Sequence, residues 1–297
     1  MQSLASRLMP LVMTLRGSKR RYSSADATLA HMAKLAASPA SGAPPQALGR
    51  RVDISLTTVA GWQVYTVSRR TGETNRRGLY LHGGSYVYEI QPQHWRLIAD
   101  LVETTGVRMT VPLFPLAPIE TAATIVPAAA DLAACLIAEA GAENVSILGD
   151  SAGGGMALAV AMILRDRGLP PVLATVLISP WLDISGTDPQ LAVIAPHDPW
   201  LAVPGSHAAG AVYRGGLAEG DPLVSPINGN LGGLGPITMF SGTRDILNAD
   251  AHRLVVMAEI AGLRMEYYEM PEMLHVYPLL PIPEARVARA VMRAAIA

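Results

Sequence analysis

One serine stands in a setting that favours nucleophilic chemistry. Gly149-Asp150-Ser151-Ala152-Gly153 fits the pattern G-x-S-x-G, and it lies between an apolar segment ending at Leu148 and a small-residue segment with helical character. In a strand-to-helix turn of this kind, glycines let the two elements approach closely, and the serine hydroxyl is exposed on a strained backbone. A serine is a weak nucleophile at neutral pH, so it needs a base and a group that orients the base. The pattern predicts acyl transfer by Ser151, against the plainer interpretation of a packing turn.

The base must be a histidine downstream of the serine. The chain has seven histidines, and in the order serine, acid, histidine only His252 and His275 lie far enough along. His252 falls inside a helical pattern over residues 251–261, from which it would reach the serine poorly. His275 lies in a loop after a predicted strand at 264–269, where an open α/β sheet presents residues to its crevice. We therefore predict His275 as the base, with a packing or surface histidine as the alternative.

The acid should follow a strand. Residues 237–240 form an apolar run that leads to Asp245, which would lie just beyond the strand's carboxyl end. Its rivals are Asp250, Glu269 and Glu272, of which Asp250 is better explained as a cap of the next helix. Asp245 would accept a hydrogen bond from His275 and stabilise the imidazolium.

Attack on an acyl carbonyl creates an oxyanion that needs aimed donors. The backbone N–H of Ala152 is the first candidate, and Gly83 and Gly84, which follow a short strand at 78–81, are the others. We interpret His82 as a structural residue that holds this loop.

The elements that would position these groups alternate along the chain. Strands are predicted at 78–81, 107–113, 145–148, 173–178, 237–240 and 264–269, and helices at 95–105, 122–140, 152–167, 251–261 and 284–295. An antiparallel pair at 51–59 and 62–69 precedes them. This alternation predicts the α/β class, with a mostly parallel sheet flanked by helices. The strand at 264–269 is a candidate sheet edge, which leaves a homodimer open.

Two regions lie outside this alternation. Residues 1–50, helical to about 38 and then a linker, and the Pro- and Gly-rich residues 184–220 are assigned to a helical cap over a catalytic domain at 51–297. The apolar residues 8–15 are followed by a basic cluster, which predicts an amphipathic helix rather than a secretory signal. That helix either packs on its own domain or lies on a membrane surface.

Bulk composition excludes several classes of function. The 297 residues carry a formal net charge of -1, which predicts no nucleic-acid partner. No stretch reaches the roughly 18 uninterrupted apolar residues of a membrane span. The lone Cys135 excludes an internal disulfide, and we expect it to be a buried thiol in a helix. No Cys/His spacing suggests a metal site. A cytoplasmic protein is the expectation.

With these residues identified, the chain resembles the hormone-sensitive lipase family of esterases, within the α/β-hydrolase fold. His82-Gly83-Gly84-Ser85-Tyr86 is similar to that family's HGGG-aromatic motif, and Gly149 to Gly154 matches GDSAGG. Residues 116–118, 179–183 and 221–226 also resemble the family. The resemblance runs from about residue 50 to the C-terminus.

The resemblance implies a cofactor-free carboxylic ester hydrolase for short to medium acyl chains. It assigns Ser151, Asp245 and His275 as the triad and Gly83, Gly84 and Ala152 as oxyanion donors. Ser85 replaces the third glycine of the motif, and Pro115 and Ile119 also depart from the family. Ser85, Tyr86 and Trp181 are candidate pocket residues.

Three alternatives stay open. An amidase or arylformamidase uses the same constellation, and a non-catalytic ligand-binding protein can be built on a hydrolase scaffold. A lipase that acts at a lipid surface is the third, because of the N-terminal helix.

Overall fold

The computed structural model describes residues 2–72 and 74–297 and contains one eight-stranded sheet in the order β1-β2-β4-β3-β5-β6-β7-β8. The strands are β1 (Val52–Val59), β2 (Trp62–Arg69), β3 (Arg77–Leu81), β4 (Arg108–Leu113), β5 (Val145–Asp150), β6 (Ala174–Ile178), β7 (Ile237–Gly242) and β8 (Met265–Met270). The six strands from β4 to β8 in this order are parallel, and β2 pairs antiparallel with β1 and β4. The predicted α/β class is confirmed, and β8 is an edge strand as predicted.

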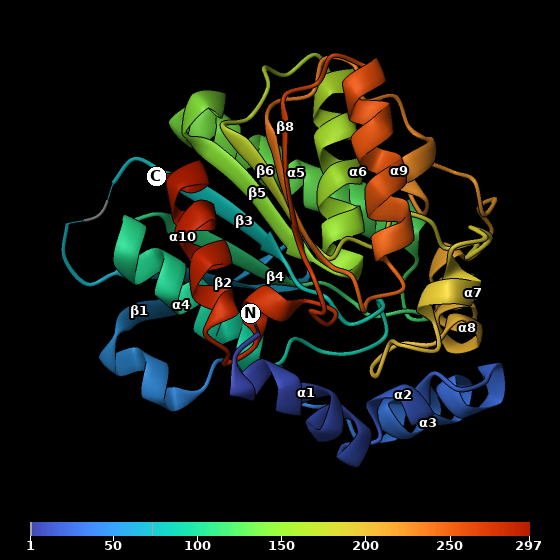
Figure 1. The fold of residues 1–297 in the computed structure, drawn as a ribbon. Coiled ribbons are helices and arrows are strands. Elements are labelled where there is room, and N and C mark those ends of the chain that lie inside the picture. Colours follow the sequence, from blue (N-terminus) through green and yellow to red (C-terminus); the bar gives the residue numbers. More distant parts are fainter. Residues whose placement is uncertain (1, 73) are drawn as a thin grey trace.

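Helices cover both faces of the sheet (Figure 1). One apolar cluster joins the sheet to α4 (Pro92–Thr105) and α10 (Glu284–Ile296), and another joins it to α5 (Ala122–Ala140), α6 (Ala152–Asp166) and α9 (Asn248–Ile260). Short buried strands such as β6, with all five residues buried, read as continuous apolar runs because both of their faces are covered. The two layers hold the carboxyl ends of the parallel strands rigidly, and the candidate residues follow those ends.

α5 is long and apolar enough to span a membrane by length and composition. It packs against α6, β3 and β5, with residues such as Ile125, Ala129 and Ala133 fully buried, which is the behaviour of a core helix. Cys135 lies on its other face and is exposed, so the prediction of a buried thiol was wrong. The cause is the run of small apolar residues around Cys135, which marks no polar face by which the exposed side could be recognised.

The N-terminal residues form three short helices: α1 (Leu4–Leu15), α2 (Ser18–Arg21) and α3 (Ala25–Ala37). α3 packs on α8 (Val203–Arg214), and the Gly205 N–H of α8 donates to the Tyr22 carbonyl at 2.9 Å. A Cβ at Gly205 would stand 2.4 Å from Tyr22 Cα, so glycine is needed for this approach. We call α1, α2, α3 and α8 the cap helices. Between α6 and α8 the chain also forms α7 (Leu191–Ile194), and five-residue or shorter 3₁₀ turns lie at Gln46–Arg50, Ala142–Asn144, Pro226–Asn228 and Tyr277–Leu279.

Candidate active site

Ser151 lies in the turn between β5 and α6 with φ 54° and ψ −122°, a conformation that L-residues rarely adopt. Its N–H donates to the Ile178 carbonyl at 2.8 Å, and its carbonyl accepts the N–H of Trp181 at 2.8 Å. A Cβ at Gly149 would stand 2.1 Å from the Gly153 carbonyl oxygen, so this turn requires glycine there. The surrounding hydrogen bonds therefore hold the serine in its strained conformation.

The structure brings the three predicted triad residues together in one hydrogen-bonded chain. His275 Nε2 lies 3.0 Å from Ser151 Oγ, and His275 Nδ1 lies 2.8 Å from Asp245 Oδ2. All three side chains are buried, and Asp245 is completely enclosed. With Asp245 accepting from Nδ1–H, Nε2 is left as the acceptor that faces the serine hydroxyl. The arrangement is that of a nucleophile, a base and an orienting carboxylate.

Two loops carry the acid and the base, and they are fastened to each other. The Arg244 N–H donates to the Met273 carbonyl at 3.0 Å, and the Glu272 N–H donates to Thr243 Oγ1 at 2.8 Å. Ser179 Oγ, after β6, accepts the Val276 N–H at 3.0 Å. These bonds place His275 over the carboxyl ends of β5 and β6.

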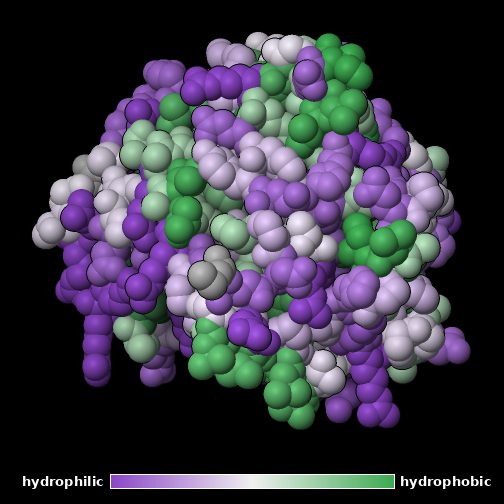
Figure 2. Space-filling model, in the orientation of Figure 1, coloured by the Kyte–Doolittle hydropathy of each residue, from purple (hydrophilic) through white to green (hydrophobic). Residues whose placement is uncertain are grey.

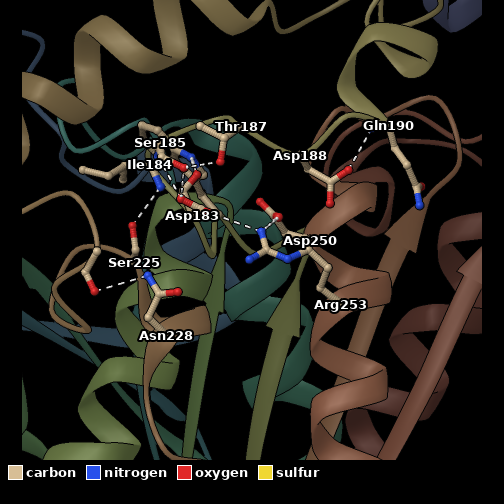
Figure 3. Close-up of polar contacts among 12 residues, drawn as sticks. Asp183, Ile184, Ser185, Thr187, Asp188, Gln190, Ser225, Asn228, Asp250 and Arg253 are labelled. Carbon is tan, nitrogen blue, oxygen red and sulfur yellow. Dashed lines mark hydrogen bonds and ion pairs between the residues drawn. The ribbon is translucent and has the colours of Figure 1, made fainter.

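The rival acids are occupied elsewhere. Asp250 lies in the first turn of α9 and pairs with Arg253 at 2.7 Å, and Arg253 also pairs with Asp183 at 3.0 Å (Figure 3). Burial raises the pKa of Asp250 to about 6, against the opposing hydrogen bond from Arg253. Glu269 accepts from Asn248 and bonds His252, and Glu272 is exposed.

The same network joins two of the segments that resemble the family. Asp183 ends the segment 179–183, and its Oδ1 accepts the Ser185 N–H at 2.9 Å. Ser225, in the segment 221–226, accepts the Ile184 N–H at 3.0 Å (Figure 3). These segments therefore support the chain that leads from β6 to α7 and do not enter the triad.

The oxyanion loop needs a correction at Gly83. Its N–H donates to Asp150 Oδ1 at 3.0 Å, so it is already engaged. Within residues 2–72 and 74–297, the N–H groups of Gly84, Ser85 and Ala152 have no protein acceptor. The glycine at 83 serves close approach instead, because a Cβ there would lie 2.2 Å from Asp150 Oδ2 and 3.0 Å from Ser151 Cβ. The acceptor, Asp150, directly precedes the nucleophile. The His-Gly-Gly motif gives no sign that this carboxylate binds the Gly83 N–H.

Asp150 is the centre of a buried network under this loop. It also accepts from Tyr80 Oη at 2.7 Å and lies 3.2 Å from His94 Nε2. His94 Nδ1 accepts the Gln91 N–H at 2.8 Å, so the ring proton is on Nε2 and donates to Asp150. Burial would raise the pKa of Asp150, but His94 and the other donors outweigh it and lower the pKa.

His82 holds the loop from beneath. Its Nδ1 donates to the Gly83 carbonyl at 2.7 Å, and its ring stacks on Phe114 with centroids 4.3 Å apart. Burial is the main cause that lowers its pKa to about 4, so the ring is neutral. His82 therefore has the structural role that the sequence predicts. Within the described residues, its ring forms no hydrogen bond with Ser151 or His275.

A cavity of about 1430 Å³ opens above Ser151 and His275. Its lining is largely apolar and comes from the cap helices (Met13, Leu29, Met32, Val212), from the catalytic side (Phe114, Leu116, Leu279, Leu280) and from Trp200. Ser85 also lines it, and its hydroxyl lies 2.9 Å from Tyr22 Oη of the cap.

Tyr86 and Trp181 do not line this cavity, contrary to prediction. Tyr86 is buried in a stack with Tyr213 and Trp181, and its hydroxyl donates to the Ala152 carbonyl at 2.7 Å. Trp181 is buried and donates to the Asp183 carbonyl at 3.0 Å. Both rings are therefore part of the core beside the nucleophile turn.

Asp198 is a second carboxylate beside the triad that sequence reasoning missed. It is buried; its Oδ1 accepts the N–H groups of Trp200 and Leu201 at 2.7 and 2.9 Å, and its Oδ2 accepts that of Ile246 at 3.0 Å. Ile246 is the neighbour of Asp245, and the Trp200 ring contacts the His275 ring edge-on with centroids 5.6 Å apart. In the sequence, Asp198 is marked only by the Pro199 that follows it. The folding of residues 184–220 over the site brings its carboxylate beside the triad.

The electrostatics of His275 reflect these carboxylates. Burial works to lower the pKa of His275, but the charge and hydrogen bond of Asp245, with the charges of Asp198 and Asp150, outweigh it and raise the pKa. Burial and the nearby Asp245 raise the pKa of Asp198 to about 6, against three backbone N–H donors. In the described part of the chain, no three His, Cys, Asp or Glu side chains are grouped so that they could hold a metal ion.

Fold and site define the class: an α/β hydrolase with a serine on its nucleophile elbow. Residues 78–279 match the family described as alpha/beta hydrolase fold. A triacylglycerol lipase of Mycobacterium tuberculosis is 34% identical over 230 residues, with 76% of this chain and 47% of that protein covered. An acetyl-hydrolase of Streptomyces hygroscopicus is 33% identical over 222 residues, with 72% and 73% covered.

Comparison with solved structures gives the same fold and class of protein. An esterase from the bacterial hormone-sensitive lipase family has a TM-score of 0.83 and 25% identity, with 100% of both chains covered. The chain belongs to the alpha/beta hydrolase fold family and, within it, to the hormone-sensitive lipase group of esterases and lipases. It spans 47% of the M. tuberculosis lipase, about half of that protein's length. The resemblance given by the sequence motifs is thereby confirmed.

Proposed function

We propose that this protein hydrolyses carboxylic esters of short to medium acyl chain through an acyl-enzyme on Ser151. The observation that carries the proposal is the unbroken series of hydrogen bonds from Asp245 through His275 to Ser151 Oγ, at the floor of an apolar cavity. A serine nucleophile requires such a series of hydrogen bonds, whereas a protein that only binds a ligand does not require it.

The proposed reaction has two steps. Ser151 Oγ bonds to the acyl carbon while its proton passes to His275 Nε2, and the oxyanion accepts from the N–H groups of Gly84, Ser85 and Ala152. His275 then gives the proton to the leaving alcohol. Water, deprotonated by His275, attacks the acyl carbon, and the carboxylic acid leaves as Ser151 Oγ recovers its proton.

Ser151→Ala tests the proposal with p-nitrophenyl acetate, butyrate, octanoate and palmitate. Wild type should turn over the shorter esters, with kcat lower for palmitate, and the variant should lose about 10⁴-fold or more in kcat. Asp221→Asn, a change at a carboxylate that bonds only its own turn at Leu223 in the described structure, is the matched control and should keep its activity. Equal turnover by wild type and Ser151→Ala would overturn the mechanism. A preference for the matching anilides over the esters would make the protein an amidase.

A further inference from the structure

One face of α1 carries large apolar side chains that no other part of the described structure covers. Leu4, Leu8, Leu11 and Leu15 are 72%, 50%, 56% and 79% exposed. Their spacing of four, three and four residues places them in a single stripe along the helix. The opposite face, with Ser6 and Met13, is buried against the rest of the molecule. We call these four residues the leucine stripe; Figure 2 shows the apolar surface at the lower edge of the molecule, where α1 runs in Figure 1.

The leucine stripe lies in the most basic part of the chain. Residues 2–37 contain one acidic residue, Asp26, and the cations Arg7, Arg16, Lys19, Arg20, Arg21 and Lys34, although the whole chain has a net charge of -1. In the described structure, none of these cations forms an ion pair with a carboxylate. An apolar helix face flanked by uncompensated cations is the composition of a helix that lies in the interface of an anionic bilayer.

The position of α1 relates this surface to the site. Met13 on the buried face of α1, and Arg16 and Ser18 just after it, line the same cavity as Ser151 and His275. The leucine stripe therefore points outward from the wall of the cavity whose floor is the triad. A bilayer under the stripe would lie beside the cavity rather than behind the sheet.

We propose that the leucine stripe, with Arg7 of α1 and Arg20 and Arg21 of α2, docks this protein on an anionic lipid surface. The docking holds the cavity next to the bilayer, so that esters dissolved in it reach Ser151; this last step rests on the proposed function, whereas the docking does not. A second copy of the chain fits the surface less well. Two copies meeting at their leucine stripes would bring two sets of unpaired cations together, and like charges repel.

Flotation of the protein with liposomes tests the docking without any catalysis, since Ser151→Ala can be used throughout. Vesicles of phosphatidylcholine with one fifth phosphatidylglycerol are compared with vesicles of phosphatidylcholine alone. The stripe variant is Leu11→Gln with Leu15→Gln. Its matched control is Val256→Gln with Ile260→Gln, a pair on α9 with the same spacing and similar exposure, 56% and 82%. A charge variant, Arg7→Gln with Arg20→Gln, leaves the cavity lining unchanged.

The unaltered chain should float with the anionic vesicles, and binding should weaken as salt rises. The stripe variant should partition at least about tenfold more weakly, because two exposed leucines no longer leave water on binding. The charge variant should lose the preference for anionic vesicles, and the α9 control should bind like the unaltered chain.

Three outcomes would overturn the proposal: no flotation of the unaltered chain, equal flotation of the stripe and α9 variants, or a dimer in light scattering that the stripe variant alone dissociates. The last would show that a second copy covers the stripe. The same variants with Ser151 intact are then assayed with p-nitrophenyl butyrate. Because this soluble ester needs no surface, its turnover tests the proposed esterase activity separately from the docking.

Discussion

At the scale of single residues, Asp198 affects the reactivity of Ser151 without a hydrogen bond to it, because its charge acts on the pKa of His275. Its charge is one of three that raise the pKa of His275, and its oxygens hold the N–H groups of Trp200 and Ile246 on either side of the triad. A general base works only when it is unprotonated, so a raised pKa confines activity to higher pH. Asp198 is in this sense a positioning residue, because it acts through His275.

Asp198→Asn should therefore move the acid limb of the kcat/KM profile to lower pH. The change removes the negative charge that favours the imidazolium, while the amide oxygen can still accept from Trp200 and Leu201. A pH series with p-nitrophenyl butyrate measures this shift, and Asp221→Asn, which is not among the charges that act on His275, is the control. An acid limb that stays in place while kcat falls at every pH would mean that Asp198 acts only as packing.

The place of each residue in the fold decides whether the sequence predicts its part in the site. Ser151, Asp245 and His275 each follow a strand of the parallel sheet, and a local pattern is enough to find such positions. Asp198 and Tyr22 belong to the cap region, where no periodic strand pattern gives their place, and only tertiary packing brings them to the site. The His-Gly-Gly motif predicts Gly83 as a donor, but it carries no information on the distant Asp150, which accepts the Gly83 N–H.

At the scale of elements, the sequence predicts the strands and the helices that flank the sheet to within a few residues, but it does not predict the separate N-terminal helices. β1 and β2 meet through a two-residue turn at Ala60 and Gly61, both at positive φ, as the glycine suggested. The N-terminal helical stretch instead divides into three helices, because Gly17, at φ 64°, and the serines before Ala25 interrupt it. The division lets Lys19 of α2 reach the loop that carries Asp198.

That lysine ties the cap to the catalytic loops. Lys19 Nζ donates to the carbonyls of Ala195 and Asp198 at 2.6 and 2.7 Å. Lys19→Met should lower kcat/KM for p-nitrophenyl butyrate by about threefold or more, because the two charge-assisted hydrogen bonds that fix the loop beside His275 are lost. Steady-state kinetics measure this loss, and the control is Lys34→Met, which replaces an exposed lysine of α3. Matching losses in both variants would assign the effect to charge alone.

At the scale of the whole molecule, the first and last helices hold each other. Glu284, at the start of α10, accepts the Ser3 N–H at 2.6 Å and bonds the hydroxyls of Ser3 and Ser6 at the start of α1. Burial works to raise the pKa of Glu284, but these donors outweigh it and lower the pKa to about 2. The stabilisation is thus fully present above the ordinary glutamate pKa of about 4.3 and is lost as pH falls through about 2.

Glu284→Gln should loosen α1 at neutral pH, because a neutral amide oxygen accepts these hydrogen bonds more weakly than a carboxylate. Hydrogen exchange over residues 4–15 should become faster in the variant at pH 7, while exchange in β5 and β6 stays slow. Glu266→Gln, on the edge strand β8, is the control and should leave α1 unchanged. Unaltered exchange of α1 in Glu284→Gln would show that its buried face alone holds the helix.

The backbone of Ser151 bears on what selection must maintain. A non-glycine residue at φ 54° and ψ −122° raises the free energy of the native state by about 1–3 kcal/mol, and any lineage that needed only a stable scaffold would gain by placing glycine there. The serine at this position therefore costs native-state stability, and in return the turn brings Ser151 Oγ within 3.0 Å of His275 Nε2.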